Sequence, residues 1–160
     1  MKEVKKDMID KISILFICHG NICRSPMAEF IMKDLCRKQG YTMEVDSVAA
    51  TYEEIGNDMY YPARSKLKEK GIPFSKRQAR ILTKSDYQKF DHIYYMDAEN
   101  RRDILRILGS DSQHKVQRLL PDCDVSDPWW TDDFETAYQD IWEGCTYRLK
   151  QLAQMIYAYE

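Results

Sequence analysis

The segment from Cys18 to Ser25 combines a thiol with the groups that bind a phosphate. It reads Cys-His-Gly-Asn-Ile-Cys-Arg-Ser, so five residues separate the first cysteine from Arg24. Gly20 lets the backbone approach an oxyanion closely, and Asn21 tolerates the left-handed conformation that a tightly curled loop often needs. The guanidinium of Arg24 can hold two phosphate oxygens at once. The spacing therefore predicts a nucleophilic thiol that faces a phosphate-binding loop.

The surroundings expected for Cys18 favour the ionised thiol. A loop that runs into a helix N-terminus points several backbone N–H groups inward, and the helix dipole adds positive potential there. Thiols in such surroundings lose their proton more readily than free cysteine does. The hydroxyl of Ser25 can also donate a hydrogen bond to the sulfur. Because no Gly-Lys-Ser/Thr sequence follows, the loop does not match the Walker A pattern of nucleotide hydrolysis.

Two elements have to hold this loop in place. Residues 12–17, Ile-Ser-Ile-Leu-Phe-Ile, form a nearly continuous apolar run, which is typical of a strand buried on both faces. After the loop, Pro26 opens a helical pattern that Gly40 ends. The apolar residues of this pattern recur at helical spacing: Met27, Phe30, Ile31 and Leu35. Cys18 is therefore expected at the end of a strand, opposite the N-terminus of a helix.

The rest of the chain alternates between strand and helix patterns. Apolar runs predict strands at residues 42–49, 93–96 and 116–120, and helical periodicity predicts helices at 62–70, 100–108 and 134–156. Parallel strands need such crossover connections. The expected fold is α/β, a three-layer sandwich with a four-stranded parallel sheet and helices on both faces. Ligands of such folds bind beyond the carboxyl ends of the strands, where the loop after the first strand lies.

Composition and charge exclude several classes of function. The 24 Lys and Arg residues against 26 Asp and Glu residues give a net charge of −2, which argues against nucleic-acid binding through bulk positive charge. No apolar run reaches the length of a membrane span. No repeat or linker divides the sequence, so we expect one domain over residues 1–160, with residues 1–10 as a polar leader.

The cysteines and histidines predict neither a disulfide framework nor a metal site. The five cysteines are an odd number without paired spacing, and the three histidines lie far apart in the sequence. Free thiols suit a reducing compartment. We therefore expect a cytoplasmic protein that works without a metal or another cofactor.

Residues 18–29, Cys-His-Gly-Asn-Ile-Cys-Arg-Ser-Pro-Met-Ala-Glu, resemble the phosphate-binding signature of the low-molecular-weight protein tyrosine phosphatases. The resemblance extends over nearly the whole chain, and residues 127–130, Asp-Pro-Trp-Trp, fall where that family has an Asp-Pro-aromatic-aromatic loop. It implies hydrolysis of phosphotyrosine and small aryl phosphates through a phosphocysteine intermediate. The implied partners are phosphotyrosine-containing proteins, which serve as substrates.

This resemblance implies a role for each residue of the site. Cys18 is the expected nucleophile, and Asp127 is the expected acid that protonates the leaving phenolate and then accepts a proton from water. Arg24 and the backbone N–H groups of the loop would hold the phosphate oxygens. The loop residues expected to bind substrate are His19, Gly20, Asn21, Ile22, Cys23 and Ser25. Two adjacent indoles cannot easily both face inward, so Trp129 and Trp130 are expected to form cleft walls around the aryl ring.

Some positions depart from the family pattern. His19 stands where an apolar residue is usual and would add charge or a hydrogen-bond donor near the pocket mouth. Tyr52 could partly replace a tryptophan that relatives often carry beside the cleft, while Glu53 and Glu54 would disfavour acidic substrate flanks. Cys23 is either a small packing residue or the partner of Cys18 in a reversible disulfide, and the spacing leaves both interpretations open.

Proteins with other functions also have a phosphate-binding loop of this kind. Relatives that act on phosphoarginine tend to carry Thr where this chain has Ile22, and they lack a second aromatic residue after Asp-Pro. Arsenate reductases need downstream cysteines, and residues 80–100 contain none. A phosphate-binding protein or a phosphocarrier without turnover needs neither Arg24 in the loop nor the acid Asp127. Tyrosine phosphatase is therefore the expected activity.

Overall fold

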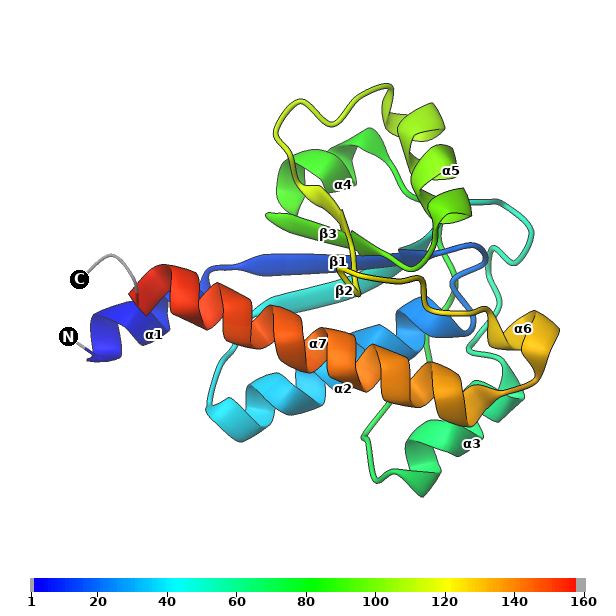
Figure 1. Ribbon diagram of the computed structural model, residues 1–160, viewed down its shortest axis with the longest axis horizontal. Coiled ribbons are helices and arrows are strands. Elements are labelled where there is room, and N and C mark those ends of the chain that lie inside the picture. The colour runs from blue at the N-terminus through cyan, green and yellow to red at the C-terminus, as the bar shows by residue number, and fades with distance from the viewer. Residues whose placement is uncertain (1, 158–160) are drawn as a thin grey trace.

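A parallel sheet of four strands forms the centre of the computed structural model, which describes residues 2–157, with side chains from residue 5 onward (Figure 1). The strands lie in the order β2-β1-β3-β4, and all the pairings among them are parallel. Their bounds are Ser13–Cys18 for β1, Glu44–Ala49 for β2, His92–Tyr95 for β3 and Val116–Arg118 for β4. The sheet predicted from the sequence is confirmed, although β2 and β4 are shorter than expected.

Helices cover both faces of this sheet (Figure 1). One face carries α1 (Lys2–Asp10), α2 (Arg24–Gln39), α3 (Tyr61–Glu69) and α7 (Phe134–Tyr157), and the other carries α4 (Lys84–Lys89) and α5 (Ala98–Leu108). The short helix α6 (Pro128–Thr131) lies at the end of the molecule where the carboxyl end of β1 points. This arrangement confirms the predicted three-layer sandwich.

The strand β1 separates two apolar clusters. All six of its residues are buried, as expected for a strand with both faces covered. Ile14 and Phe16 belong to the cluster under α2 and α7, while Leu15 and Ile17 belong to the cluster under α5. Because successive side chains of a strand point to opposite faces, this one strand contributes to both clusters. Its burial on both sides therefore fixes the position of the loop that follows it.

The helix α2 begins at Arg24, two residues before the Pro26 start that the sequence suggested. It ends as predicted at Gly40, whose φ of 76° is left-handed and therefore favours glycine. The earlier start matters because Arg24 becomes the first helical residue. Its side chain is then held at the helix N-terminus, on the side that faces the loop.

Residues 2–10 form the helix α1, where the sequence suggested only a polar leader. Ile9 is fully buried in the apolar cluster beside α7. The Asp10 carboxylate accepts a hydrogen bond from the backbone N–H of Thr42 at 2.7 Å. The helix escaped prediction because its other residues are mostly charged, so that a periodic apolar pattern is missing.

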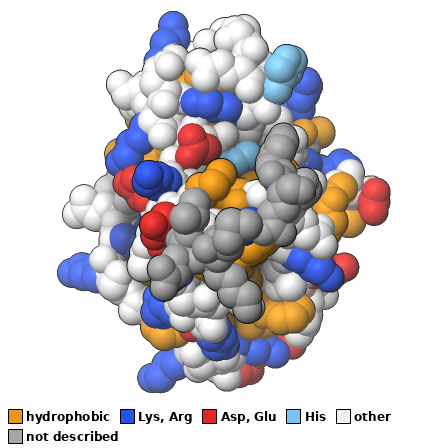
Figure 2. Space-filling view, turned by 90° about the vertical axis from the view of Figure 1, so that its left-hand side faces the viewer, with side chains coloured by type: hydrophobic (Ala, Val, Ile, Leu, Met, Phe, Trp, Pro, Cys, Tyr) orange, Lys and Arg blue, Asp and Glu red, His pale blue; other side chains and the backbone are white. Residues whose placement is uncertain are grey.

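The end of the molecule that carries both termini exposes side chains of both charges. Figure 2 shows Lys and Arg side chains interspersed with Asp and Glu side chains on this face, with apolar side chains between them. Within residues 2–157, no helix is long and apolar enough to span a membrane.

Candidate active site

The loop between β1 and α2 curls around Asn21. Its φ of 59° is left-handed, as the sequence predicted for this position. The Asn21 amide donates hydrogen bonds to the hydroxyls of Ser25 at 2.8 Å and Ser47 at 3.0 Å. Arg77 donates to the backbone oxygen of Asn21 at 2.6 Å. The loop is therefore fixed in its curled form from below, by contacts to β2 and to the segment before α4.

Cys18 lies beneath this loop with a hydroxyl beside its sulfur. The Sγ atom is 3.1 Å from the Oγ atom of Ser25. Because that hydroxyl already accepts a hydrogen bond from the Asn21 amide, its own proton is free to be donated to sulfur. An alternative acceptor, the backbone oxygen of Val48, lies farther away at 3.5 Å. The predicted contact between Ser25 and Cys18 is confirmed, and it places a hydrogen-bond donor beside the sulfur.

Arg24 is 1% exposed and is held by several oxygen atoms. Its NH1 atom donates to an Asp97 carboxylate oxygen and to the backbone oxygen of Val125, both at 2.7 Å. Its NH2 atom is 3.4 Å from the carboxylate of Asp127. Burial would lower the pKa of Arg24, but the charges of Cys18, Asp127 and Asp97 outweigh it and raise this pKa. The guanidinium is therefore a fixed positive charge in the site.

Asp97 orients Arg24 although the sequence assigned it no role. It begins α5, where its side chain accepts a hydrogen bond from the backbone N–H of Asn100 at 2.9 Å. The Asn100 side chain accepts in return from the backbone N–H groups of Met96 and Asp97. This capping box leaves the second carboxylate oxygen of Asp97 for Arg24. A local signal existed, since an acidic residue followed by Asn three positions later marks a helix start.

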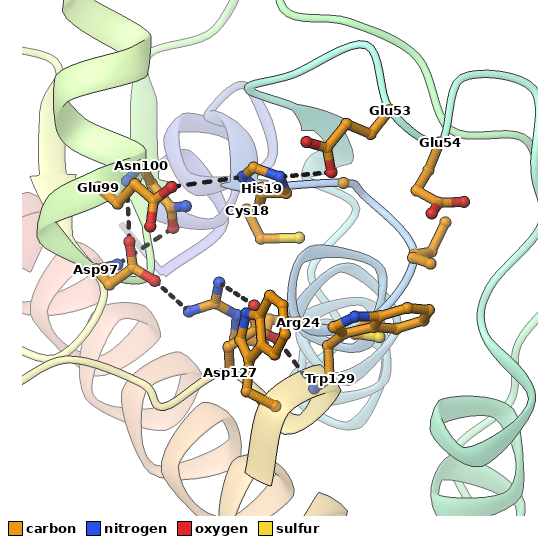
Figure 3. A pocket seen from close by; sticks show the side chains of 14 residues that line it. Cys18, His19, Arg24, Glu53, Glu54, Asp97, Glu99, Asn100, Asp127 and Trp129 are labelled. Carbon is orange, nitrogen blue, oxygen red and sulfur yellow. Dashed lines mark hydrogen bonds and ion pairs between the residues drawn. The ribbon is translucent and has the colours of Figure 1, made fainter. Parts of the chain in front are cut away.

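A cavity of about 600 Å³ opens over the sulfur of Cys18. Nine of the predicted site residues line it: Cys18, His19, Gly20, Ile22, Cys23, Arg24, Asp127, Trp129 and Trp130. Five further residues complete the lining, of which Glu53 and Glu54 come from the loop after β2 and Asp97, Glu99 and Asn100 from the start of α5 (Figure 3). Of these five residues, the sequence analysis had singled out only Glu53 and Glu54.

Three predicted substrate-binding residues do not line this cavity. Asn21 and Ser25 are fully buried, so their side chains support the loop from below. Tyr52 is 76% exposed and is also absent from the lining, so the structure contradicts its expected role as a cleft wall. Its neighbours Glu53 and Glu54 line the cavity instead.

The aromatic wall consists of Trp129, supported by a residue that the sequence did not single out. The ring centroids of Tyr60 and Trp129 are 4.9 Å apart, and Phe134 packs edge-on against Tyr60 at 6.1 Å. The backbone N–H of Tyr60 also donates to the oxygen of Ile22 in the loop. Trp130 is 82% exposed and lies at the outer edge of the cavity. Tyr60 therefore couples the wall to the phosphate-binding loop.

Asp127 is positioned by the start of α6. One carboxylate oxygen accepts a hydrogen bond from the backbone N–H of Trp129 at 3.1 Å, and the other faces Arg24. Pro128 follows and restricts the backbone. The carboxylate and the sulfur of Cys18 therefore line the same cavity from two elements far apart in the sequence. A nucleophile and a proton donor can thus act on one bound group.

Cys23 is buried and lines the same cavity. Burial, followed by the charges of Cys18 and Asp127, raises the pKa of the Cys23 thiol well above its ordinary value. Cys23 therefore stays protonated and does not compete with Cys18 as the nucleophile. Both thiols are free in this structure, so the disulfide between them stays a prediction.

The chain is similar in sequence to known phosphatases. A family model described as low molecular weight phosphotyrosine protein phosphatase matches residues 13–157. The chain is 40% identical over 144 residues to the low molecular weight phosphotyrosine protein phosphatase of Homo sapiens, covering 83% of this chain and 90% of that protein. It is 39% identical over 142 residues to the low molecular weight protein-tyrosine-phosphatase YfkJ of Bacillus subtilis, covering 84% and 91% of the two chains.

Solved structures share the fold. The crystal structure of YfkJ from Bacillus subtilis superposes with a TM-score of 0.86 at 37% identity, covering 91% of this chain and 96% of that one. The crystal structure of DARP, described as a Drosophila arginine phosphatase, superposes with a TM-score of 0.79 at 29% identity, covering 87% of this chain and 96% of that one. The helix α1 lies outside the residues that the family model matches.

Proposed function

The chain belongs to the low molecular weight phosphotyrosine protein phosphatase family, and we propose that Cys18, Arg24 and Asp127 carry out its hydrolysis of phosphotyrosine. As a member of this family it is a metal-independent hydrolase that acts on phosphoproteins. One observation supports the assignment of residues above all others. The buried guanidinium of Arg24 lies between two carboxylates in a cavity whose lining also includes the sulfur of Cys18.

The first step transfers the phosphoryl group to sulfur. The thiolate of Cys18 attacks phosphorus in line, an S–P bond forms, and the bond between phosphorus and the tyrosyl oxygen breaks. The electron pair of that bond leaves with the phenolate oxygen, which takes a proton from Asp127. The hydrogen bond from Ser25 stabilises the thiolate before attack, and the Trp129 backbone N–H holds the Asp127 carboxyl group toward the cavity.

Charge on the transferring group is balanced by fixed donors. The guanidinium of Arg24 and the backbone N–H groups of residues 19–24 bind the equatorial oxygens of phosphorus. Arg24 needs no reorientation during the step, because Asp97 and Val125 already hold it. Preorganised donors of this kind contribute more than mobile ones, since no reorganisation is required as charge moves.

The second step releases phosphate. A water molecule attacks phosphorus on the phosphocysteine and gives one proton to the carboxylate of Asp127, the S–P bond breaks, and the electron pair returns to the sulfur of Cys18. Inorganic phosphate leaves, and the thiolate and the protonated acid are restored for the next substrate. No metal or other cofactor is needed, because Arg24 and the loop N–H groups supply the positive potential.

Aromatic contacts favour phosphotyrosine over shorter phosphorylated side chains. The indoles of Trp129 and Trp130 line the cavity, and Tyr60 supports the first of them. Stacking on an aryl ring contributes about 0.5–1.5 kcal/mol beyond burial of its area. A phosphoserine side chain offers no ring to this wall and reaches less far toward Cys18.

Phosphoarginine is the second candidate substrate, because the structure of a Drosophila arginine phosphatase shares the fold. Ile22 and Trp130 both favour an aromatic substrate, since they add apolar surface at the loop and at the outer wall. Turnover of phosphotyrosine, phosphoserine and phosphoarginine peptides of one sequence separates these substrates. We expect the highest kcat/KM for phosphotyrosine, and a higher value for phosphoarginine would overturn the assignment.

We further propose that residues 1–160 form one domain and that the protein acts in the cytoplasm on phosphotyrosine-containing proteins rather than on nucleic acids or membranes. Contacts of Ile9 with the cluster beside α7 support a single domain. The five free thiols suit a reducing compartment, and the net charge of −2 does not favour nucleic acid.

Hydrolysis of p-nitrophenyl phosphate in the presence of a chelator tests the assigned nucleophile. We expect turnover without added metal, and its loss in Cys18→Ser, whose alcohol is a far weaker nucleophile at neutral pH. Cys36→Ser is a matched control, because this cysteine is buried under α7 and does not line the cavity. Persisting turnover in Cys18→Ser would exclude the phosphocysteine route.

A further inference from the structure

The imidazole of His19 bridges two carboxylates at the mouth of the cavity. Its Nε2 atom is 2.8 Å from a carboxylate oxygen of Glu53. Its Nδ1 atom faces a carboxylate oxygen of Glu99 at 4.0 Å, which is too long for a hydrogen bond. Figure 3 shows the ring between these two side chains, one from the loop after β2 and the other from α5. The two ring nitrogens therefore have different partners.

The contact with Glu53 determines where the neutral ring carries its proton. A carboxylate can only accept a hydrogen bond, so Nε2 is the protonated nitrogen of the neutral imidazole. The lone pair then lies on Nδ1, on the side of α5. A neutral imidazole with one nitrogen bonded to a carboxylate and the other exposed as a lone pair is the arrangement in which histidine binds transition metals.

The helix α5 presents two carboxylates to this lone pair. Glu99 and Asp103 are four residues apart and share one face of the helix. One ligand atom from each of His19, Glu99 and Asp103 lies within 4.8 Å of the other two. Glu99 is exposed, so a small rotation can shorten these distances to those of a coordinated ion. Among the residues that the structure describes, Asp103 has one competing partner, the exposed guanidinium of Arg106 at 3.2 Å.

We propose that His19, Glu99 and Asp103 form a binding site for a divalent transition-metal ion, with Zn²⁺ as the best fit. Imidazole nitrogen and carboxylate oxygen are both zinc ligands, and three protein ligands leave a fourth position for water. Mg²⁺ and Ca²⁺ prefer sites made of oxygen atoms only, so the imidazole disfavours them. Glu53 does not contact the ion and acts as the carboxylate that orients the histidine.

This site is separate from the hydrolytic chemistry, which needs no metal, and it affects access to the cavity. His19 and Glu99 both belong to the cavity lining, whereas Asp103 does not. An ion held between them joins the phosphate-binding loop to α5 and narrows the mouth. Bound Zn²⁺ therefore acts as an inhibitor that raises KM for a phosphotyrosine peptide more than it lowers kcat.

Zinc titration by calorimetry in the Cys18→Ser background tests the site without any use of activity. This background is necessary because the thiolate of Cys18 would itself bind Zn²⁺. We expect one site whose affinity falls at least tenfold when Asp103→Asn or His19→Leu is added. Glu53→Gln should weaken binding by about tenfold, as loss of an orienting carboxylate does. Glu143→Gln, at an exposed position of α7, is the matched control and should change nothing.

A kinetic experiment with intact Cys18 tests the consequence. Asp103→Asn leaves the lining intact, so its kcat/KM without metal should equal that of the parent. Its inhibition by Zn²⁺ should need at least tenfold more metal. If all variants bind Zn²⁺ as tightly as the parent in calorimetry, the ion lies elsewhere and the site is wrong. Equal inhibition of Asp103→Asn and the parent would show that zinc acts at Cys18, which would overturn the inhibitory role.

Discussion

Arg24 and Asp127 form a pair of opposite charges whose partners differ in burial. Arg24 is buried and held by Asp97 and Val125, so its position does not depend on Asp127. Asp127 is more exposed and touches Arg24 only at 3.4 Å. A buried charge needs fixed partners, whereas a proton donor needs freedom to exchange protons with substrate and water. Arg24 is therefore suited to bind phosphate from a fixed position, and Asp127 is suited to exchange protons.

Replacing Asp127 by Asn should separate proton donation from phosphate binding. We expect kcat for a phosphotyrosine peptide to fall by about 10²–10⁴-fold, the usual contribution of a positioned general acid. The loss should be smaller for p-nitrophenyl phosphate, because its leaving group is a weaker base and needs less protonation. The parent should show a bell-shaped pH profile, since the acid must be protonated while the sulfur is ionised. Initial rates over a pH series provide the measurement.

The fall of kcat at high pH tests whether Asp127 is the proton donor. In the Asp127→Asn variant the fall of kcat toward higher pH should disappear, because no proton donor remains to be lost. Asp133→Asn is a suitable control, since this exposed carboxylate caps α7 through Thr136 and does not line the cavity. An unchanged alkaline limb in Asp127→Asn would assign proton donation to another group.

Residues that act through local spacing could be predicted from the sequence, and residues that meet only in the fold could not. Cys18 and Arg24 lie on one short loop, so their relation depends on a single strand-to-helix turn. Glu99 comes from α5 and meets the loop only because β3 pairs beside β1. Tyr52 was placed wrongly because the direction of a side chain in a turn depends on contacts that sequence spacing does not contain.

At the scale of elements, short helices depend on capping rather than on apolar periodicity. The helix α4 has six residues and begins with a capping box in which Thr83 and Asp86 exchange hydrogen bonds. Arg80 links Asp86 to Asp46 in β2, and its backbone N–H donates to the Asn21 side chain. A helix of this length has too few turns for a periodic pattern, so it was not predicted. Its contacts nevertheless reach the catalytic loop.

The capping carboxylate of α4 should make stability depend on pH. Burial would raise the pKa of Asp86, but hydrogen bonds from Arg80 and Thr83 outweigh burial and hold it below its ordinary value of 3.8. A carboxyl group with a lower pKa in the folded state binds protons more readily when unfolded. Its contribution is therefore complete above the ordinary pKa and is lost as the pH falls through the lower, folded one.

Urea unfolding of the parent and of Asp86→Ala at several pH values measures this contribution. We expect the variant to be less stable at neutral pH, and the gap should narrow below pH 3.8 as the parent's carboxylate takes up its proton. Asp124→Ala is a control, because this more exposed loop residue pairs with Arg118 alone among the residues that the structure describes. A gap that stays constant down to strongly acidic pH would mean that the charge of Asp86 contributes nothing.

At the scale of the whole molecule, the candidate active site lies at one end and the two termini lie at the other. Figure 1 shows α6 beside the loop at the carboxyl end of β1, while α1 and the end of α7 lie at the opposite end of the sheet. The parallel sheet and its two helical layers followed from the alternation of strand and helix patterns, whereas the strand order β2-β1-β3-β4 did not. The packing of α1 did not, because only the fold brings Ile9 against α7.

The distance between these ends predicts that α1 affects stability and leaves catalysis unchanged. Ile9 is fully buried, and truncating a buried isoleucine to alanine costs about 2–5 kcal/mol through lost burial and the cavity left behind. Ile9→Ala should therefore lower the free energy of unfolding by about this amount, measured by urea denaturation. Its kcat/KM for p-nitrophenyl phosphate should match the parent under conditions where both are folded.

Met8 provides the comparison within the same helix. It is 48% exposed, so Met8→Ala should change the free energy of unfolding by only about 0.5 kcal/mol. Equal effects of the two substitutions would mean that α1 does not dock on α7 through Ile9. A reduced kcat/KM in folded Ile9→Ala would instead show that strain at α1 reaches the loop through β1. We expect neither result, because Ile9 lies in the cluster beside α7 and its loss leaves Asn21, Ser25 and Arg24 with their partners.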